Sequence, residues 1–262
     1  MKNRYKSATM LRDEAKDFMN GKYAGAIGVA LILFAFNYLV DTTLQMIESI
    51  LTKGFVSAGM VSDRAVLVMD IVYYVISLAL SVVLAVFTIG MNLYYLKIGC
   101  RTQAAASDLF SGFKDNLSRS FAIAFRVNGV ASLAMMPAMV MTSYYMSTRY
   151  DYALYAALGC MVVGVIIAVY TMMTYEMSYF IMHDFSEYTA GEVLAASRKK
   201  MKGNRWRLFR TEFSFIPYFI LAIFTLGIGM LWVYPLMQET KARFYLDLMN
   251  PKKVSGEWER TV

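Results

Sequence analysis

The sequence contains little histidine, cysteine and charge. Its 262 residues include one histidine and two cysteines, and 17% are charged, against roughly a quarter in average soluble domains. Cys100 and Cys160 lie on different segments and predict no disulfide framework. His183 alone cannot build a zinc site, and the sequence has no HExxH, CxxC or GxSxG motif. We therefore expect no metal, no cofactor and no enzymatic activity.

Long apolar runs account for most of the composition. The hydrophobic share is 58%, the mean hydropathy is +0.45, and five runs cover residues 23–40, 65–96, 121–146, 152–182 and 213–237. Each run approaches or exceeds the roughly 20 residues that a helix needs to cross about 30 Å of hydrocarbon. Backbone groups in lipid must be satisfied within the chain, and these runs are too long for barrel strands. The sequence predicts an all-α, polytopic helical membrane bundle forming one domain over residues 1–262.

The distribution of basic residues predicts the orientation. Six Lys and Arg precede the first run, four lie between the second and third, and seven lie in residues 198–210. Only Lys53, Arg64 and Arg149 fall on the opposite side if the runs alternate. Cytoplasmic segments of membrane proteins carry such an excess, so the N-terminus is expected in the cytoplasm.

The last run is expected to form a hairpin. A single crossing would place five C-terminal basic residues outside, whereas a turn at "TLGIG", residues 225–229, returns the C-terminus to the cytoplasm. The preferred model has six spans, with five as the alternative. The six spans are about 23–40, 67–96, 121–146, 153–182, 209–225 and 229–248, and residues 41–64 form an extracytoplasmic loop.

Two amphipathic helices are expected on the cytoplasmic face. In the first, Leu11, Ala15 and Phe18 recur at helical spacing, so the helix lies in the membrane interface or packs on the bundle's own loops. In the second, Thr189 and Glu192 form a capping-box pattern that begins a helix of about 190–202.

The basic stretch after this second helix is interleaved with aromatic residues and leads into an apolar run. Cations beside interfacial aromatics are typical of segments that face anionic lipid headgroups, and no nucleic-acid-binding signature accompanies them. A topology anchor without a specific ligand is the alternative. The candidate headgroup-binding residues are Arg198, Lys199, Lys200, Lys202, Arg205, Arg207 and Arg210.

Ionisable residues inside the runs predict a second site. Asn92, Arg126, Glu176 and Glu239 are expected at similar depth near the inner leaflet, where they form either a polar cavity or a buried ion pair, between Arg126 and Glu176, that fixes helix register. The small residues Ala156, Cys160, Gly164 and Ala168 recur at steps of four and predict close approach of an internal helix or a second copy.

These features favour a non-catalytic membrane component that binds lipids or a partner membrane protein at the inner leaflet. The alternative is a small-solute or lipid transporter that uses the polar cluster. Nucleic acid is not an expected partner.

The last quarter of the chain contains a distinctive series of motifs. Its residues are Ser197, Arg198, Met201, Lys202, Gly203, Asn204, Leu208, Phe209, Ser214, Phe215, Ile216, Gly227, Ile228, Gly229, Leu231, Trp232, Pro235, Phe244, Tyr245 and Leu248. In these residues the chain resembles an uncharacterised bacterial membrane family, domain of unknown function 975. Pro217, Tyr218 and Ala138 depart from that family's pattern. The resemblance implies a multi-span plasma-membrane protein and brings no activity with it.

Overall fold

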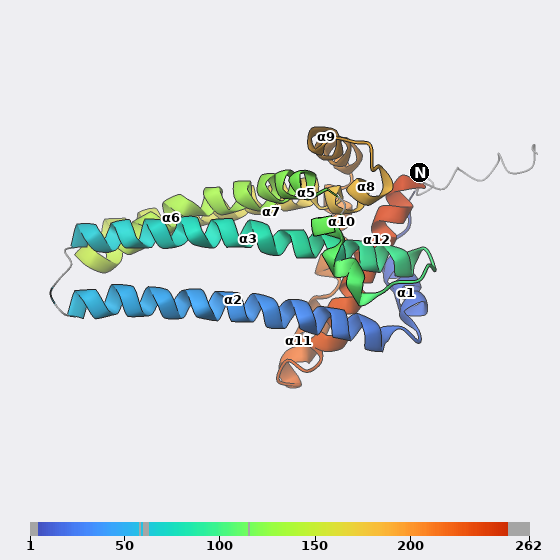
Figure 1. Ribbon diagram of the computed structural model, residues 1–262, viewed down its shortest axis with the longest axis horizontal. Helices are drawn as coiled ribbons and strands as arrows, with labels where there is room; N and C mark the ends of the chain where they lie inside the picture. Colours follow the sequence, from blue (N-terminus) through green and yellow to red (C-terminus); the bar gives the residue numbers. More distant parts are fainter. Residues whose placement is uncertain (1–4, 58, 60–62, 115, 251–262) are drawn as a thin grey trace, which may run out of the picture.

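The computed structural model describes residues 5–57, 59, 63–114 and 116–250, which form helices and no strand. Four long helices run lengthwise: α2 (Tyr23–Ser57), α3 (Asp63–Gly99), α6 (Val130–Thr148) and α7 (Asp151–Tyr175). Helices α5 (Leu117–Ala124) and η2 (Phe125–Gly129) continue directly into α6, and α8 (Ser178–Asp184) follows α7. The remaining helices, most of them short, gather at one end of these four (Figure 1). They are α1 (Ala8–Met19), η1 (Ala106–Phe110), α4 (Ser111–Lys114), α9 (Ala190–Met201), α10 (Arg205–Phe213), α11 (Ile216–Phe224) and α12 (Met230–Met249).

Four helical segments in the described residues are long and apolar enough to cross a membrane. They are Tyr23–Ile50, Ile71–Gly99, Leu117–Met146 and Asp151–Asp184. Exposed apolar side chains extend along α2 from Leu31 to Ile50 and along α7 from Tyr152 to Met172. At 1.5 Å per residue each stretch is about 30 Å long, the thickness of the hydrocarbon core. The all-helical prediction is confirmed, and these segments coincide with the first four predicted spans.

The prediction of a loop over residues 41–64 is wrong. Helix α2 continues through Ser57, and α3 begins at Asp63, so most of this segment is helical. No glycine or proline stands between Val40 and Gly54 to end the helix. The charges of this segment stopped the apolar run in the sequence, but they do not stop a helix.

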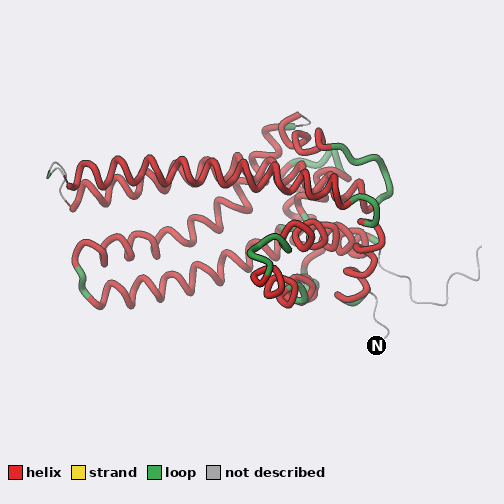
Figure 2. The backbone as a smooth tube through the Cα atoms, turned by 90° about the horizontal axis from the view of Figure 1, so that it is seen from below, coloured by secondary structure: helices red, strands yellow, loops and turns green. Residues whose placement is uncertain are grey.

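The prediction of six spans is not confirmed. The expected span 209–225 is divided into α10 and α11, and α11 has nine residues, about 14 Å at 1.5 Å per residue. Helix α12 has 20 residues but runs across the long helices instead of alongside them, as the two perpendicular views agree (Figures 1 and 2). Its second half buries Glu239 and Asp247 within the protein. This hairpin therefore differs from two parallel membrane-crossing helices.

A helical hairpin of α6 and α7 forms one side of the long bundle. A tight turn joins the two helices, because α6 ends at Thr148 and α7 begins at Asp151. Gly164 is buried in this seam, where a Cβ would lie 2.7 Å from the carbonyl oxygen of Ala134 on α6. The small-residue stripe of α7 thus meets an internal helix at Gly164, although Ala156 is exposed.

The main core lies at the end where the short helices gather. Its fully buried members include Tyr95 of α3, Phe180 of α8 and Tyr245 of α12. Leu11 and Met19 of α1 are also fully buried there. The apolar face of this N-terminal helix therefore packs on the protein, against α12, α10 and α3.

The close contact at Gly164 gives a test with a matched control on the same helix. Gly164→Ala should lower the free energy of unfolding by about 1–3 kcal/mol, because the added methyl group overlaps the α6 backbone. Gly159→Ala should stabilise the protein by up to about 1 kcal/mol, because no atom lies within 4 Å of its Cβ position and alanine favours helix. Thermal unfolding in detergent measures both, and equal effects of the two variants would contradict the α6–α7 seam.

Candidate functional site

A half-buried lysine joins three helices at the end of the long bundle where the short helices gather. Lys241 of α12 lies with its Nζ 2.9 Å from Oε1 of Glu176, the residue that ends α7, and 3.1 Å from Oε1 of Glu212 of α10. Burial alone would lower the pKa of Lys241, but the two carboxylates together raise it above its usual value. Burial raises the pKa of Glu212, against the opposing effect of Lys241. We call Glu176, Glu212 and Lys241 the acid–lysine cluster.

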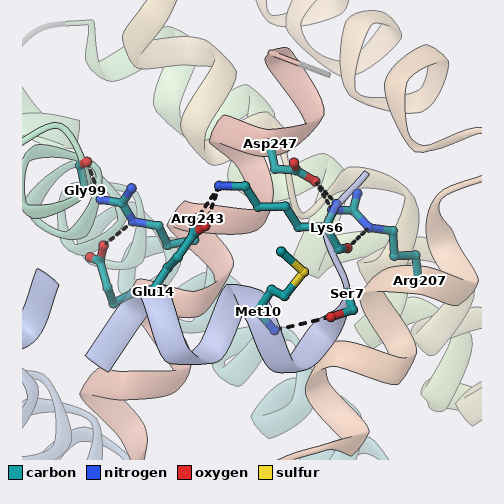
Figure 3. Close-up of polar contacts among 9 residues, drawn as sticks. Lys6, Ser7, Met10, Glu14, Gly99, Arg207, Arg243 and Asp247 are labelled. Atoms are coloured by element: carbon teal, nitrogen blue, oxygen red, sulfur yellow. Dashed lines mark hydrogen bonds and ion pairs between the residues drawn. The ribbon is translucent and has the colours of Figure 1, made fainter. Parts of the chain in front are cut away.

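A second ion pair lies within α12, and its arginine reaches the end of α3. The Oε1 atom of Glu239, a fully buried residue, lies 3.1 Å from Nε of Arg243. The guanidinium of Arg243 also donates to the carbonyl of Gly99 (Figure 3). It lies over the ring of Phe18 of α1 as well. Burial raises the pKa of Glu239 to about 8, and Arg243 limits that rise. Arg243 therefore links α12 to both α1 and α3.

A third polar group holds the N-terminal segment against α10 and α12. Lys6 lies with its Nζ 2.6 Å from Oε1 of Glu14, and its backbone N–H donates to Asp247 over 3.2 Å. Arg207 pairs with the same carboxylate and donates from Nε to the carbonyl of Lys6 over 3.3 Å (Figure 3). The guanidinium of Arg207 also lies 4.3 Å from the ring centroid of Phe244. We call Lys6, Glu14, Arg207 and Asp247 the terminal clamp.

The four residues of the predicted polar cluster have different partners. Glu176 belongs to the acid–lysine cluster and Glu239 pairs with Arg243, whereas Arg126 is exposed on the π-helical turn η2. Asn92 is buried and donates to the carbonyl of Thr88 over 2.9 Å within its own helix. The expected pairing of Arg126 with Glu176 is therefore replaced by Lys241 with Glu176. The sequence analysis predicted no role for Lys241. The signal that could have found it is its position between Glu239 and Arg243 in the predicted span 229–248.

The seven candidate headgroup-binding residues divide into an exposed and an internal group. Arg207 is engaged in the terminal clamp, and Arg205 lies 4.6 Å from the ring centroid of Tyr170 of α7. The other five side chains are exposed on α9, on α10 and in the turn between them. We call these five residues the basic face: Arg198, Lys199, Lys200, Lys202 and Arg210.

An aromatic row accompanies the basic face on α10. The rings of Trp206 and Phe209 stack with centroids 5.0 Å apart, and those of Phe209 and Phe213 with centroids 5.7 Å apart. Positions three and four apart share one face of a helix, so the three rings form a continuous strip. Trp206 and Phe213 are exposed. Exposed aromatics next to cations match the composition of a membrane interface.

Two hydrogen bonds confirm the predicted start of α9. The Thr189 hydroxyl accepts from the N–H of Glu192 over 3.4 Å, and the Thr189 N–H donates to the Glu192 carboxylate over 2.8 Å. These reciprocal bonds satisfy two donors at the beginning of the helix and lower the pKa of Glu192. Lys202 ends the helix, and Gly203 follows with a φ of 85°. This cap fixes where the lysines of the basic face begin.

The acid–lysine cluster can be tested by removing its cation. Lys241→Met should destabilise the protein by about 1–3 kcal/mol, because it leaves two half-buried carboxylates without their cation. Adding Glu176→Gln and Glu212→Gln to the same variant should restore much of the loss. Thermal unfolding in detergent measures these changes. Arg126→Gln serves as the control and should change stability little, because Arg126 is exposed; a loss as large as that of Lys241→Met would contradict the assignment.

Comparison with known proteins identifies the family. A family model described as a protein of unknown function, DUF975, matches residues 1–252. No curated protein and no solved structure matches the chain. The match extends the resemblance seen in the last quarter of the sequence over nearly its whole length. The chain therefore belongs to the DUF975 family of proteins of unknown function.

Proposed function

We propose that this protein is a non-catalytic, multi-pass component of the plasma membrane that binds anionic lipid headgroups at the inner leaflet. In this proposal the end carrying the short helices faces the cytoplasm, and both chain termini lie there. In a second form of this function, a partner membrane protein binds the same surface.

The placement of charge supports the proposed orientation. The basic face and the terminal clamp lie at the end of the molecule with the short helices. Lys53 and Arg149 are exposed at the other end of the long bundle, near the C-terminal ends of α2 and α6 (Figure 1). Cations are retained on the cytoplasmic side during insertion. Some of the residues that entered the charge argument lie outside the described residues: Lys2, Arg4, Lys252, Lys253 and Arg260.

The observation that carries the proposal is the juxtaposition of the basic face with the aromatic row. Arg205 lies over Tyr170, near the inner end of the exposed apolar stretch of α7, which brings α10 to the edge of the lipid-facing surface. Cations at this level lie within reach of phosphate groups, and each contributes about 1 kcal/mol near an anionic surface. The five exposed cations have no ion-pair partner among the described residues, so their charge is available to lipid.

The transporter alternative receives less support. It depended on a polar site formed by Asn92, Arg126, Glu176 and Glu239. In the structure the two carboxylates of that set are each paired with a cation of α12, and Arg126 is exposed. Paired buried charges are typical of a structural role in fixing helix positions.

Neutralising two exposed lysines tests the headgroup proposal. Lys199→Gln with Lys200→Gln should weaken phosphatidylglycerol binding by roughly 30-fold, since each cation contributes about 1 kcal/mol and 1.4 kcal/mol is tenfold. Phosphatidylcholine binding should stay unchanged. Native mass spectrometry of the detergent-purified protein titrated with each lipid measures both.

The matched control removes the same charge from the opposite end. Lys53→Gln with Arg149→Gln also lowers the net charge by two, and both side chains are exposed. This control should leave phosphatidylglycerol binding unchanged. An equal loss in both double variants would show that net charge, and not the basic face, holds the lipid.

A further inference from the structure

The hairpin of α11 and α12 contains an uninterrupted uncharged segment that reverses in its middle. Residues 213–237 include no Asp, Glu, Lys, Arg or His. Charged residues stand on either side of this segment, with Glu212 before it and Glu239 after it. Helix α11 ends at Phe224 and α12 begins at Met230, so the turn lies at the centre of the segment. The hairpin is therefore polar at its base and apolar at its tip.

The side chains at the tip are directed away from the rest of the protein. Leu226 is 94% exposed, Phe224 is 80% exposed and Ile223 is 73% exposed. Leu226 also adopts a φ of 52°, a left-handed conformation that glycine or asparagine tolerates better than leucine. A turn in water would favour such polar or small residues at this position. Here a large apolar side chain occupies it and is almost fully exposed.

The backbone of the turn satisfies its own donors. The N–H groups of Thr225, Leu226, Gly227, Ile228 and Met230 each donate to a carbonyl within residues 222–227, over 2.8–3.2 Å. The remaining N–H, that of Gly229, donates over 2.9 Å to the hydroxyl of Thr225, which itself donates to the carbonyl of Ala222. Six consecutive amide donors at a chain reversal are thus bonded without water. Backbone placed in hydrocarbon must bond its polar groups within the protein, and the amide donors of this turn do so.

The hairpin adjoins the lipid-facing surface of α2. The ring of Tyr234 on α12 lies 4.6 Å from that of Phe34, centroid to centroid, and Phe34 belongs to the exposed apolar stretch of α2. At the base, Arg12 of α1 donates to the carbonyl of Ser214 over 3.2 Å and lies over the ring of Tyr218. The apolar tip is therefore continuous with the surface that faces lipid, and the charged base is held by the short helices.

We propose that the α11–α12 hairpin is a re-entrant membrane element whose tip enters the hydrocarbon of the leaflet next to the basic face and turns back. The nine residues of α11 extend about 14 Å, roughly half the thickness of the hydrocarbon core. The arm is long enough to bury the tip and too short to reach the opposite surface. Acyl chains are the occupant of the tip's apolar surface. This proposal is independent of any preference for anionic headgroups, so either can fail alone.

A nitroxide at Leu226 measures the depth of the tip. Leu226→Cys is placed in a background with Cys100→Ser and Cys160→Ala, and the full chain is spin-labelled and reconstituted in vesicles of phosphatidylcholine and phosphatidylglycerol. Collisions with oxygen, which partitions into hydrocarbon, should exceed those with a water-soluble nickel chelate. Phe36→Cys on the exposed stretch of α2 should behave in the same way, and Lys199→Cys on α9 should show the reverse order.

Three results would overturn the proposal. Strong collision with the nickel chelate at residue 226 would place the tip in water. Weak collision with both reagents would mean that protein, and not lipid, covers the tip. Labelling of the unmodified cysteine by an impermeant maleimide from the side opposite the basic face would mean that the hairpin crosses the membrane. A second nitroxide at Phe224→Cys should report the same depth, which excludes a local effect of one substitution. Thermal unfolding of both labelled variants and of the background protein checks that the substitutions do not disturb the fold.

Discussion

The charge that α12 carries away from solvent is the constraint on which one end of the molecule depends, because a charge removed from water must find a partner within the protein. Helix α12 carries Glu239, Lys241 and Arg243 into the protein interior, and each makes an ion pair there. Their partners and neighbours lie on α1, α3, α7 and α10, so satisfying α12 assembles the whole end of the molecule. An ion pair of this kind contributes little net stability, but leaving one member alone is costly. The pairs therefore specify one arrangement of helices more than they strengthen it.

The same constraint acts on the backbone and explains why the two ends of the hairpin differ. Near its base, side chains of α1 and α10 supply hydrogen-bond and charge partners, as Arg12 does for the carbonyl of Ser214. At the tip the side chains of Phe224 and Leu226 are exposed, and the turn bonds its own amides through Thr225 and the neighbouring carbonyls. The hairpin thus has a polar base held by other helices and an apolar tip whose amide donors are bonded within the turn.

Local patterns in the sequence predicted local structure, and they failed where the partner was distant. The apolar runs located four long helices, and Thr189 with Glu192 located the start of α9, because the relevant bonds lie within four residues. The hydropathy pattern also ended the first predicted span at Val40, although α2 continues to Ser57. The charged residues after Val40 lower the hydropathy, but they do not break the helix. The sequence analysis also paired Glu176 with Arg126, because both residues were expected at a similar depth in the membrane. Lys241 lies far away in the sequence, and only the transverse path of α12 brings it to Glu176.

That path follows from the composition of the last run. As a straight span, residues 229–248 would place Glu239, Lys241 and Arg243 in hydrocarbon, at a cost of about 2.5–3.5 kcal/mol for each charge near the centre. Crossing the bundle places the charged half against α3, α7 and α10, and it leaves the uncharged half beside Phe34 at the lipid-facing surface. Each half thus meets the environment that its residues require. Gly227 and Gly229 lie in the turn between α11 and α12, where Gly227 adopts a φ of 86°. The re-entrant hairpin proposed above keeps Lys241 paired with Glu176 and Glu212 and leaves the uncharged tip to lipid, whereas a full crossing by the second arm would separate Lys241 from both carboxylates.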